Sequence, residues 1–275
     1  MKGYLAMKRQ LGGLIAAAAI VSAGSASATT IILDGGGSNT PGGTTIEGLN
    51  VGNTRTYTSG PVTVTAQGWT YDTSYNPDQL LSSYLGAYSG GGLGVSSPHV
   101  DANGQCWFGC SGDGNGGSEE GFSGNQHAVD NNDDGRIDFV LLKFNTAVDL
   151  TSVFFNVYDV NPGGSADGDA TAYYKGGAFA PASGGDATAY LNQFTSIGLP
   201  GSSSGSRNVS GLTFSDTWLI GAAANSDGND GFKLFSVSFD AAAVPEPATW
   251  LSMIMGFGLI GVMMRRRRQM AAIAA

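Results

Sequence analysis

The residues best suited to chemistry lie in one acidic run, residues 130–138. Its side-chain oxygens fall at positions one, three and five of a D-x-[DN]-x-[DN]-G calcium loop, and Gly135 follows them to make the turn. Alternate oxygens on a tight turn converge on one side of the backbone, which is the arrangement that a hard cation requires. The expected metal ligands are therefore Asp130, Asn132, Asp134, the carbonyl of Arg136, and Asp138.

The calcium pattern is incomplete, which leaves a second interpretation open. Position twelve of the loop is Leu141, so the bidentate glutamate of a helix–loop–helix calcium site is missing. The alternative is an acidic turn between two strands, stabilised by hydrogen bonds from side chains to the backbone. We expect weakly bound calcium as the one cofactor. The other acidic segments, 159–161, 167–169 and 225–230, are interpreted as solvated loops.

Motifs for nucleophilic catalysis are weak. Residues 201–205 match G-x-S-x-G, but they follow Pro200 in a serine-glycine linker without the strand–turn–helix context of a nucleophile elbow. His99 and His127 are the two histidines, and neither has a recognisable catalytic neighbourhood. We therefore predict that the protein is not an enzyme. A secreted glycoside hydrolase remains the less favoured alternative, because paired carboxylates are easily found among so many acids.

The two cysteines, Cys106 and Cys110, are predicted to form a disulfide. They enclose Trp107, Phe108 and a glycine, and in an oxidising compartment such a pair closes a small loop. The closed loop would add about 2 kcal/mol at most in the chain-entropy model. A metal site is less consistent with this pair, since no further cysteine exists and the nearest histidine is His99.

Charge excludes one class of partner. Residues 29–243 hold six basic side chains against 21 acidic ones, a net charge of −15. Such a surface repels nucleic acid and bare anionic polysaccharide. It would approach an anionic matrix only through divalent cations.

The middle of the chain has the pattern of an all-β protein. Glycine clusters separate short runs rich in β-branched and aromatic residues, and only residues 77–88 have apolar positions at helical spacing. This organisation predicts a β-sandwich, jelly-roll-like in topology. The predicted strands are 29–33, 62–66, 137–144, 150–158, 209–214, 218–222 and 232–239.

The N-terminus has the features of a secretory signal peptide. Three basic residues precede an apolar core from Leu11 to Val21, and Ala26-Ser27-Ala28 is a small-x-small cleavage site. We predict that residues 1–28 are the signal peptide, with Ala26 and Ala28 at the cleavage site. The mature ectodomain then covers residues 29–243.

The C-terminus combines a proline hinge, an apolar stretch and a basic stop. Pro245-Glu246-Pro247 is followed by Trp250, by an uncharged run that ends at Met264, and by Arg265, Arg266, Arg267 and Arg268. Two prolines in three residues favour an extended, protease-accessible segment. The fifteen uncharged residues would span about 22 Å as a helix, short of a hydrocarbon core of roughly 30 Å. The arginines are expected to stay cytoplasmic.

This tail resembles the PEP-CTERM sorting signal in its variant with tryptophan three residues after the second proline. The resemblance implies that residues 244–268 are a sorting signal with a short transmembrane helix, followed by a cytoplasmic tail, 269–275. It also implies processing by an exosortase-type protease near the Pro-Glu-Pro, after transient insertion in the inner membrane. The alternative is an ordinary single-span anchor that is never cut.

Residues 126–240 are similar to a family of exosortase-dependent surface proteins, through segments such as Asp138–Phe144, Trp218–Ala222 and Asp230–Val237. That resemblance implies no catalytic residue. We expect a non-enzymatic surface or extracellular-matrix protein, associated with exopolysaccharide and found at the cell surface, in the outer envelope or in the medium. The alternative is a carbohydrate-binding module with an aromatic platform, for which the candidates are Trp69, Tyr71, Tyr75, Trp107 and Phe108.

Overall fold

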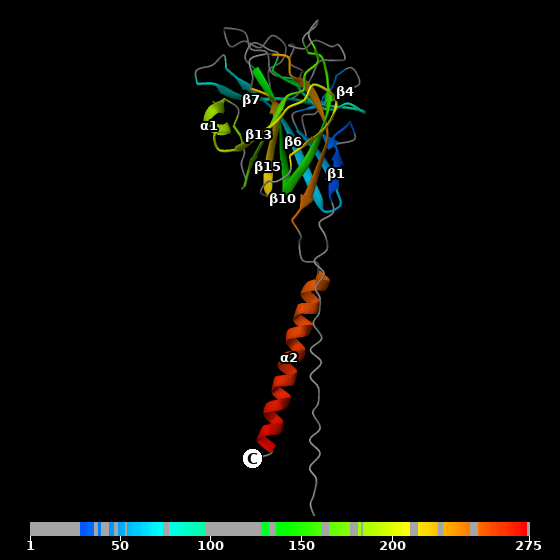
Figure 1. The fold of residues 1–275 in the computed structure, drawn as a ribbon, viewed down its shortest axis with the longest axis vertical. Coiled ribbons are helices and arrows are strands. Elements are labelled where there is room, and N and C mark those ends of the chain that lie inside the picture. The colour runs from blue at the N-terminus through cyan, green and yellow to red at the C-terminus, as the bar shows by residue number, and fades with distance from the viewer. Residues whose placement is uncertain are drawn as a thin grey trace, which may run out of the picture. The chain divides into compact units, whose positions relative to one another are not determined.

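The computed structural model divides the chain into two compact units (Figure 1). One unit is Ala26–Ala242, and the described part of the other is the C-terminal segment 247–273. The structure describes residues 28–35, 38–39, 44–46, 49–52, 54–73, 77–96, 128–131, 136–160, 165–176, 181–182, 184–209, 214–224, 228–242 and 247–273.

The first of these units is mostly β-strand, as the sequence predicted, and all its described strands belong to one hydrogen-bonded sheet. The larger strands are β1 (Thr29–Ile32), β5 (Thr54–Ser59), β6 (Val62–Asp72), β7 (Gln79–Tyr88), β8 (Gly92–Ser96), β10 (Arg136–Val157), β11 (Ala170–Lys175), β13 (Thr195–Leu199), β14 (Gly205–Asn208), β15 (Ser215–Ala222) and β16 (Gly231–Ala241). Short strands complete it: β2 (Ser38–Asn39), β3 (Thr44–Ile46), β4 (Leu49–Gly52), β9 (Val129–Asp130) and β12 (Gly185–Asp186).

Strand β10 organises the unit because its two halves have different neighbours. Its first half pairs with β6 and β15, while its second half pairs with β16 and β14. The pairings β10–β16–β8–β7–β6 then return to β10, so these strands form a closed ring. The predicted sandwich is thus one continuous sheet that closes on itself, since a 22-residue strand runs through both predicted strands 137–144 and 150–158.

The main core lies on the inner face of this ring. Along β6 the buried positions alternate from Val62 through Val64 to Ala66, as expected of a strand with one face in the core. Opposite them, β10 contributes Leu142 and Phe144 in register with Ala66 and Val64. Burial of these apolar side chains provides the main driving force for closing the sheet.

A second, smaller cluster covers the outer face of β6, β10 and β15. Helix α1 (Ala187–Leu191) lies over this face and buries Tyr190 against Phe139 and Leu219. Residue 221 must be glycine here, because a Cβ at Gly221 would lie 2.2 Å from Cδ1 of Phe139. The helix was not predicted from the sequence.

Two predictions of local structure need correction. The helix expected over residues 77–88 is wrong, because this segment is strand β7, paired with β6 on one side and β8 on the other. Hydrogen bonds on both edges outweigh a helical spacing of five apolar side chains. The strand expected over 209–214 also differs: β14 ends at Asn208, and neither Val209 nor Phe214 is in a strand, while 210–213 lie outside the described residues.

The tail contains helix α2 (Pro247–Ile273), which includes the uncharged run expected to be helical but begins at the second proline and continues through the arginines. Pro247 stands at the first helical position, where the missing N–H costs nothing. Within the described part of the chain, no helix has both the length and the apolarity needed to cross a bilayer.

Candidate metal centre

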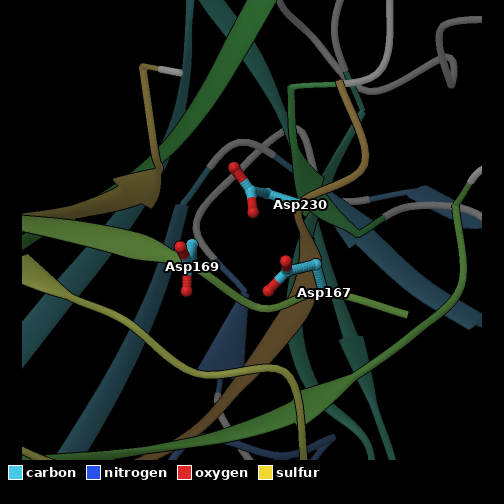
Figure 2. A group of neighbouring side chains, drawn as sticks. All are labelled: Asp167, Asp169 and Asp230. Carbon is cyan, nitrogen blue, oxygen red and sulfur yellow. The ribbon is translucent and has the colours of Figure 1, made fainter. Parts of the chain in front are cut away.

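Three aspartates from two distant segments meet at one end of the strand ring. Asp167 and Asp169 precede β11, and Asp230 precedes β16. Each offers a carboxylate oxygen, and these oxygens lie within 4.8 Å of one another. Figure 2 shows the three side chains gathered together. Asp230 is fully buried. We call this group the aspartate triad.

Backbone contacts hold the two segments together. Asp167 and Asp230 form an isolated parallel bridge, and the N–H of Gly231 donates to the carbonyl of Asp167 at 2.8 Å. On the other side, the N–H of Ala223, which follows β15, donates to the carbonyl of Asp169 at 3.1 Å. The triad is therefore built on the ends of three strands, β11, β15 and β16, of which β16 belongs to the ring.

Glycines next to the triad allow this close approach. A Cβ at Gly168 would lie 2.4 Å from Cγ2 of Val157, and one at Gly231 would lie 2.3 Å from Cγ1 of Val160. Neither position has room for a larger residue unless β10 and the segment after it shift. The glycines thus fix the spacing of the three carboxylates.

Each carboxylate accepts a hydrogen bond that orients it. Oδ1 of Asp167 accepts from the N–H of Gly168 at 2.7 Å, and Oδ1 of Asp169 accepts from the N–H of Gly201 at 2.5 Å. Oδ2 of Asp230 accepts from Nδ2 of Asn131 at 2.7 Å. Each carboxylate has a second oxygen besides these, and carboxylate oxygens are the ligands preferred by hard cations.

Asn131 connects the triad to the acidic run in which calcium ligands were expected. Its Nδ2 also donates to the carbonyl of Ala223 at 2.9 Å, and its Oδ1 accepts from the N–H of Asp230 at 3.0 Å. Asp130, the first expected ligand, is buried in β9, which pairs with the start of β16. Asn132 and Asp134 lie outside the described residues.

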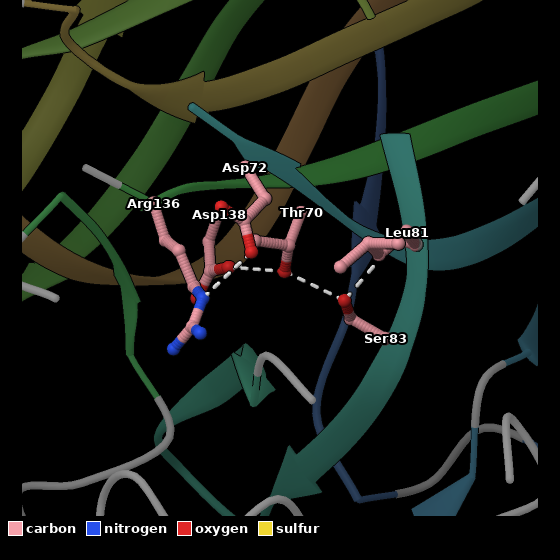
Figure 3. A network of polar contacts seen from close by, with 6 residues as sticks. All are labelled: Thr70, Asp72, Leu81, Ser83, Arg136 and Asp138. Atoms are coloured by element: carbon pink, nitrogen blue, oxygen red, sulfur yellow. Dashed lines mark hydrogen bonds and ion pairs between the residues drawn. The ribbon is translucent and has the colours of Figure 1, made fainter. Parts of the chain in front are cut away.

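The last two expected ligands lie in a buried polar network at the start of β10 (Figure 3). Nε of Arg136 forms an ion pair with Oδ2 of Asp72 at 3.0 Å. Oδ1 of Asp138 accepts from the hydroxyl of Thr70 at 2.6 Å, and that hydroxyl lies 2.6 Å from Oγ of Ser83. These side chains join β10 to β6 and β7, so the structure shows a role for Arg136 and Asp138 that the loop pattern did not suggest.

Sequence reasoning identified the acidic segments but not their meeting. Residues 167–169 and 225–230 were interpreted as separate solvated loops, whereas Asp230 is fully buried against the other two aspartates. The available signal was the glycine next to each acid, which indicated tight backbone packing. Pairing segments some sixty residues apart required the sheet topology.

Of the residues considered for the aromatic platform of a carbohydrate-binding module, the structure describes Trp69 and Tyr71, and Trp69 is buried. Trp69 is 7% exposed and packs in the outer cluster beneath α1. The hydroxyl of Tyr71 donates to Oδ2 of Asp78, and burial raises the pKa of this tyrosine. Tyr75, Trp107 and Phe108 lie outside the described residues, as do Cys106, Cys110 and Ala26.

Comparison with known families decides the character of the tail. Residues 243–268 match the PEP-CTERM protein-sorting motif. The chain is a PEP-CTERM sorting-domain protein. The PEP-CTERM motif indicates an exported protein that is targeted to an exosortase and sorted through the membrane. In this tail Arg265 and Arg266 are exposed on α2, whereas Pro245 and Glu246 lie outside the described residues. No match was found among curated proteins or among solved structures.

Proposed function

We propose that this PEP-CTERM protein is a non-enzymatic component of the cell surface or extracellular matrix, and that it associates with exopolysaccharide. The observation that carries the proposal is the sorting motif at residues 243–268, which follows a single β-rich unit. The precursor is held at the inner membrane for a time, cut near the Pro-Glu-Pro, and then displayed or released.

Calcium is the cofactor that we propose for this unit. The aspartate triad supplies three carboxylates from two segments, and Asn131 places the acidic run 130–138 beside them. Calcium binds six to eight oxygens, so the triad needs further oxygens from the acidic run or from water. A bound cation would also reduce the repulsion between a domain of charge −15 and an anionic polysaccharide.

Two observations favour a scaffold over a sugar-binding or hydrolytic module. Trp69 is enclosed in the outer cluster, so it offers no face for stacking on a sugar ring. The buried carboxylates of Asp72 and Asp138 are engaged with Arg136 and Thr70, which stabilises the fold rather than presenting an acid and a base to a substrate.

Processing of the tail is tested by mass spectrometry of protein recovered from the outer envelope and the medium of its host. We expect mature chains that end near Pro245-Glu246-Pro247 and lack Trp250 and the arginines. Replacing Pro245 and Pro247 by alanine should leave the precursor uncut in the inner-membrane fraction. An intact C-terminus on all surface material would contradict exosortase processing.

The calcium proposal is tested by thermal unfolding of the mature protein with and without calcium. A ligand that binds only the native state raises the free energy of unfolding by about 2.7 kcal/mol when its concentration is a hundredfold above Kd. Asp230→Asn keeps the size of the side chain and removes its charge, so it should abolish most of the calcium-induced rise in Tm. Asp216→Asn, on β15 beside Thr217, is the charge-matched control. An equal rise in both variants would indicate diffuse screening only.

Exopolysaccharide binding is tested with the same three proteins. Polysaccharide purified from the host should retain the wild type and Asp216→Asn in calcium, and release both in a chelator. Asp230→Asn should bind weakly under both conditions. If the polysaccharide retains the wild type equally well in calcium and in chelator, the proposal that calcium links the protein to the polysaccharide is wrong.

A further inference from the structure

The two ends of the β-rich unit lie side by side. Strand β1 pairs antiparallel with β16, with Thr29 opposite Phe239 and Ile31 opposite Val237. Ile31 and Leu33 are buried in the main core, so this first strand is part of the folded unit. The register therefore places the residue before Thr29 opposite Asp240.

Asp240 faces a second aspartate across its other edge. On β10, Asp149 lies directly opposite Asp240, and the pairing continues to the end of β16, where the N–H of Ala242 donates to the carbonyl of Ala147. Like charges directly opposite each other destabilise an antiparallel pair. Oδ1 of Asp149 is buried and has no hydrogen-bond partner among the described residues. Burial, and then the charge of Asp240, raise the pKa of Asp149.

Removal of the signal peptide would create a cation at this point. Cleavage after Ala28 turns the backbone nitrogen of Thr29 into an α-ammonium group. The N–H of Leu33 donates to the carbonyl of Phe235 at 2.7 Å, and hydrogen-bonded positions recur every second residue in an antiparallel ladder. Thr29 occupies the same kind of position, so its nitrogen is directed at the carbonyl that links Phe239 to Asp240.

We propose that the new N-terminus at Thr29 is a binding group for Asp240, and that this ion pair fastens β1 to β16 only after the signal peptide has been removed. Neighbouring strands lie about 4.8 Å apart, which brings the ammonium within reach of the Asp240 carboxylate. In the precursor the same nitrogen is an uncharged amide. The proposal rests on the proposed export, and it adds that processing completes the fold.

Other charged groups near this corner do not replace the ammonium. On β10 and β15, Lys143 and Asp216 lie where those two strands pair, before β10 reaches Asp149. Arg207 on β14 is opposite Val153 and donates to the carbonyls of Gly201 and Ser203. Strand β1 has no charged side chain. Among the described residues on these strands, Asp240 is therefore the charge next to the new N-terminus, and Asp149 lies one strand further away, on β10.

The test uses mature protein purified from its host and measures the pKa of its α-amino group by NMR. An ordinary α-amino group has a pKa of about 7.7–8.0, and an opposite charge within hydrogen-bonding reach raises it by about one unit or more. We expect the raised value in the wild type and in Asp216→Asn. Asp240→Asn should bring the pKa back to the ordinary range, while Asp149→Asn should leave it raised.

Three outcomes would overturn the proposal. They are an ordinary pKa in the wild type, a raised pKa that survives Asp240→Asn, and N-terminal sequencing that finds a start other than Thr29. Tail processing is measured separately by mass spectrometry. The failure of this ion pair can therefore be distinguished from the failure of the proposed export route.

Discussion

Thr70 shows what a single hydroxyl contributes to this fold. It is fully buried and donates to Asp138, and it also lies beside Ser83, so it links β10, β6 and β7. A buried acceptor that loses its donor costs far more than an average hydrogen bond is worth, because its desolvation is no longer compensated.

Thr70→Val should therefore lower the free energy of unfolding by about 1–3 kcal/mol. Valine keeps the shape of threonine, so the lost free energy of unfolding comes from the missing hydroxyl and not from a cavity. Thr63→Val is the matched control, since the Thr63 hydroxyl makes an exposed contact with Thr58. Denaturant unfolding gives both values, and equal stability of the two variants would show that the network contributes nothing.

Lys233 is a buried cation enclosed by two aromatic rings. Its Nζ lies 4.0 Å from the ring centroid of Tyr158 and 4.5 Å from that of Tyr88, and the residue is 1% exposed. Cation–π attraction strengthens when the partners are shielded from water. We predict that Lys233→Met lowers the free energy of unfolding by about 1–2 kcal/mol.

Lys175→Met provides the control for this change. Nζ of Lys175 lies 6.0 Å from the ring centroid of Phe194, and it donates to Oε1 of Gln193 in an exposed hydrogen bond. A substitution at such a surface position should change the unfolding free energy by about 0.5 kcal/mol or less. If Lys175→Met lowers the free energy of unfolding as much as Lys233→Met does, then Tyr88 and Tyr158 do not stabilise Lys233 by cation–π attraction.

Among the elements, α1 depends on one capping side chain. Oδ1 of Asp186 accepts from the N–H of Ala189, and the helix has only five residues in which to bury Tyr190. So short a helix is held by its cap and by packing, because its own hydrogen bonds are too few.

Asp186→Ala should cost about 1 kcal/mol, the usual loss for an N-cap, and the loss should be local. Hydrogen exchange at Ala189 should accelerate, while exchange in β10 stays unchanged. If β10 accelerates equally, α1 unfolds only together with the whole unit, and the local role of the cap is wrong.

At the scale of the whole molecule, buried tyrosines couple the fold to alkaline pH. Burial raises the pKa of Tyr57 and of Tyr190 above the ordinary value for a phenol. An unfolded tyrosine ionises near pH 10, whereas these two stay neutral to higher pH in the fold. Their contribution is therefore fully present below about pH 10 and is lost as the pH rises through the folded values.

We predict that the free energy of unfolding falls steeply above about pH 10, measured by urea unfolding at a series of pH values. Tyr57→Phe should reduce that slope, because one of the raised groups is removed. It will also lower stability at neutral pH, since the Tyr57 hydroxyl donates to the carbonyl of Asp34. The test is therefore the slope of the unfolding free energy against pH, not its value at neutral pH. An unchanged slope in Tyr57→Phe would contradict a raised pKa for Tyr57 in the folded state.

Parts of the fold follow from local pattern and parts do not. Val62, Val64 and Ala66 alternate with threonines, and this period of two correctly predicted a strand with one buried face. In β16 the pattern was harder to interpret. A register shift in its pairing with β10 puts Leu234 and Val237 on the inner face and Lys233 and Phe235 on the outer face, where Tyr88 and Tyr158 cover Lys233. The helix prediction for residues 77–88 was wrong because the spacing of the apolar residues fits a helix, whereas the segment pairs with strands on both sides.

The sequence alone identified the protein as one exported and sorted through the membrane, because a sorting signal is read as a linear string of prolines, apolar residues and arginines. It also determined the β-rich character, which depends on residue type and alternation. Only the tertiary structure decided which acids meet. Asp167, Asp169 and Asp230 converge because β11 and β16 begin at the same end of the sheet. Contacts between residues so far apart in the chain depend on sheet closure, which no local pattern encodes.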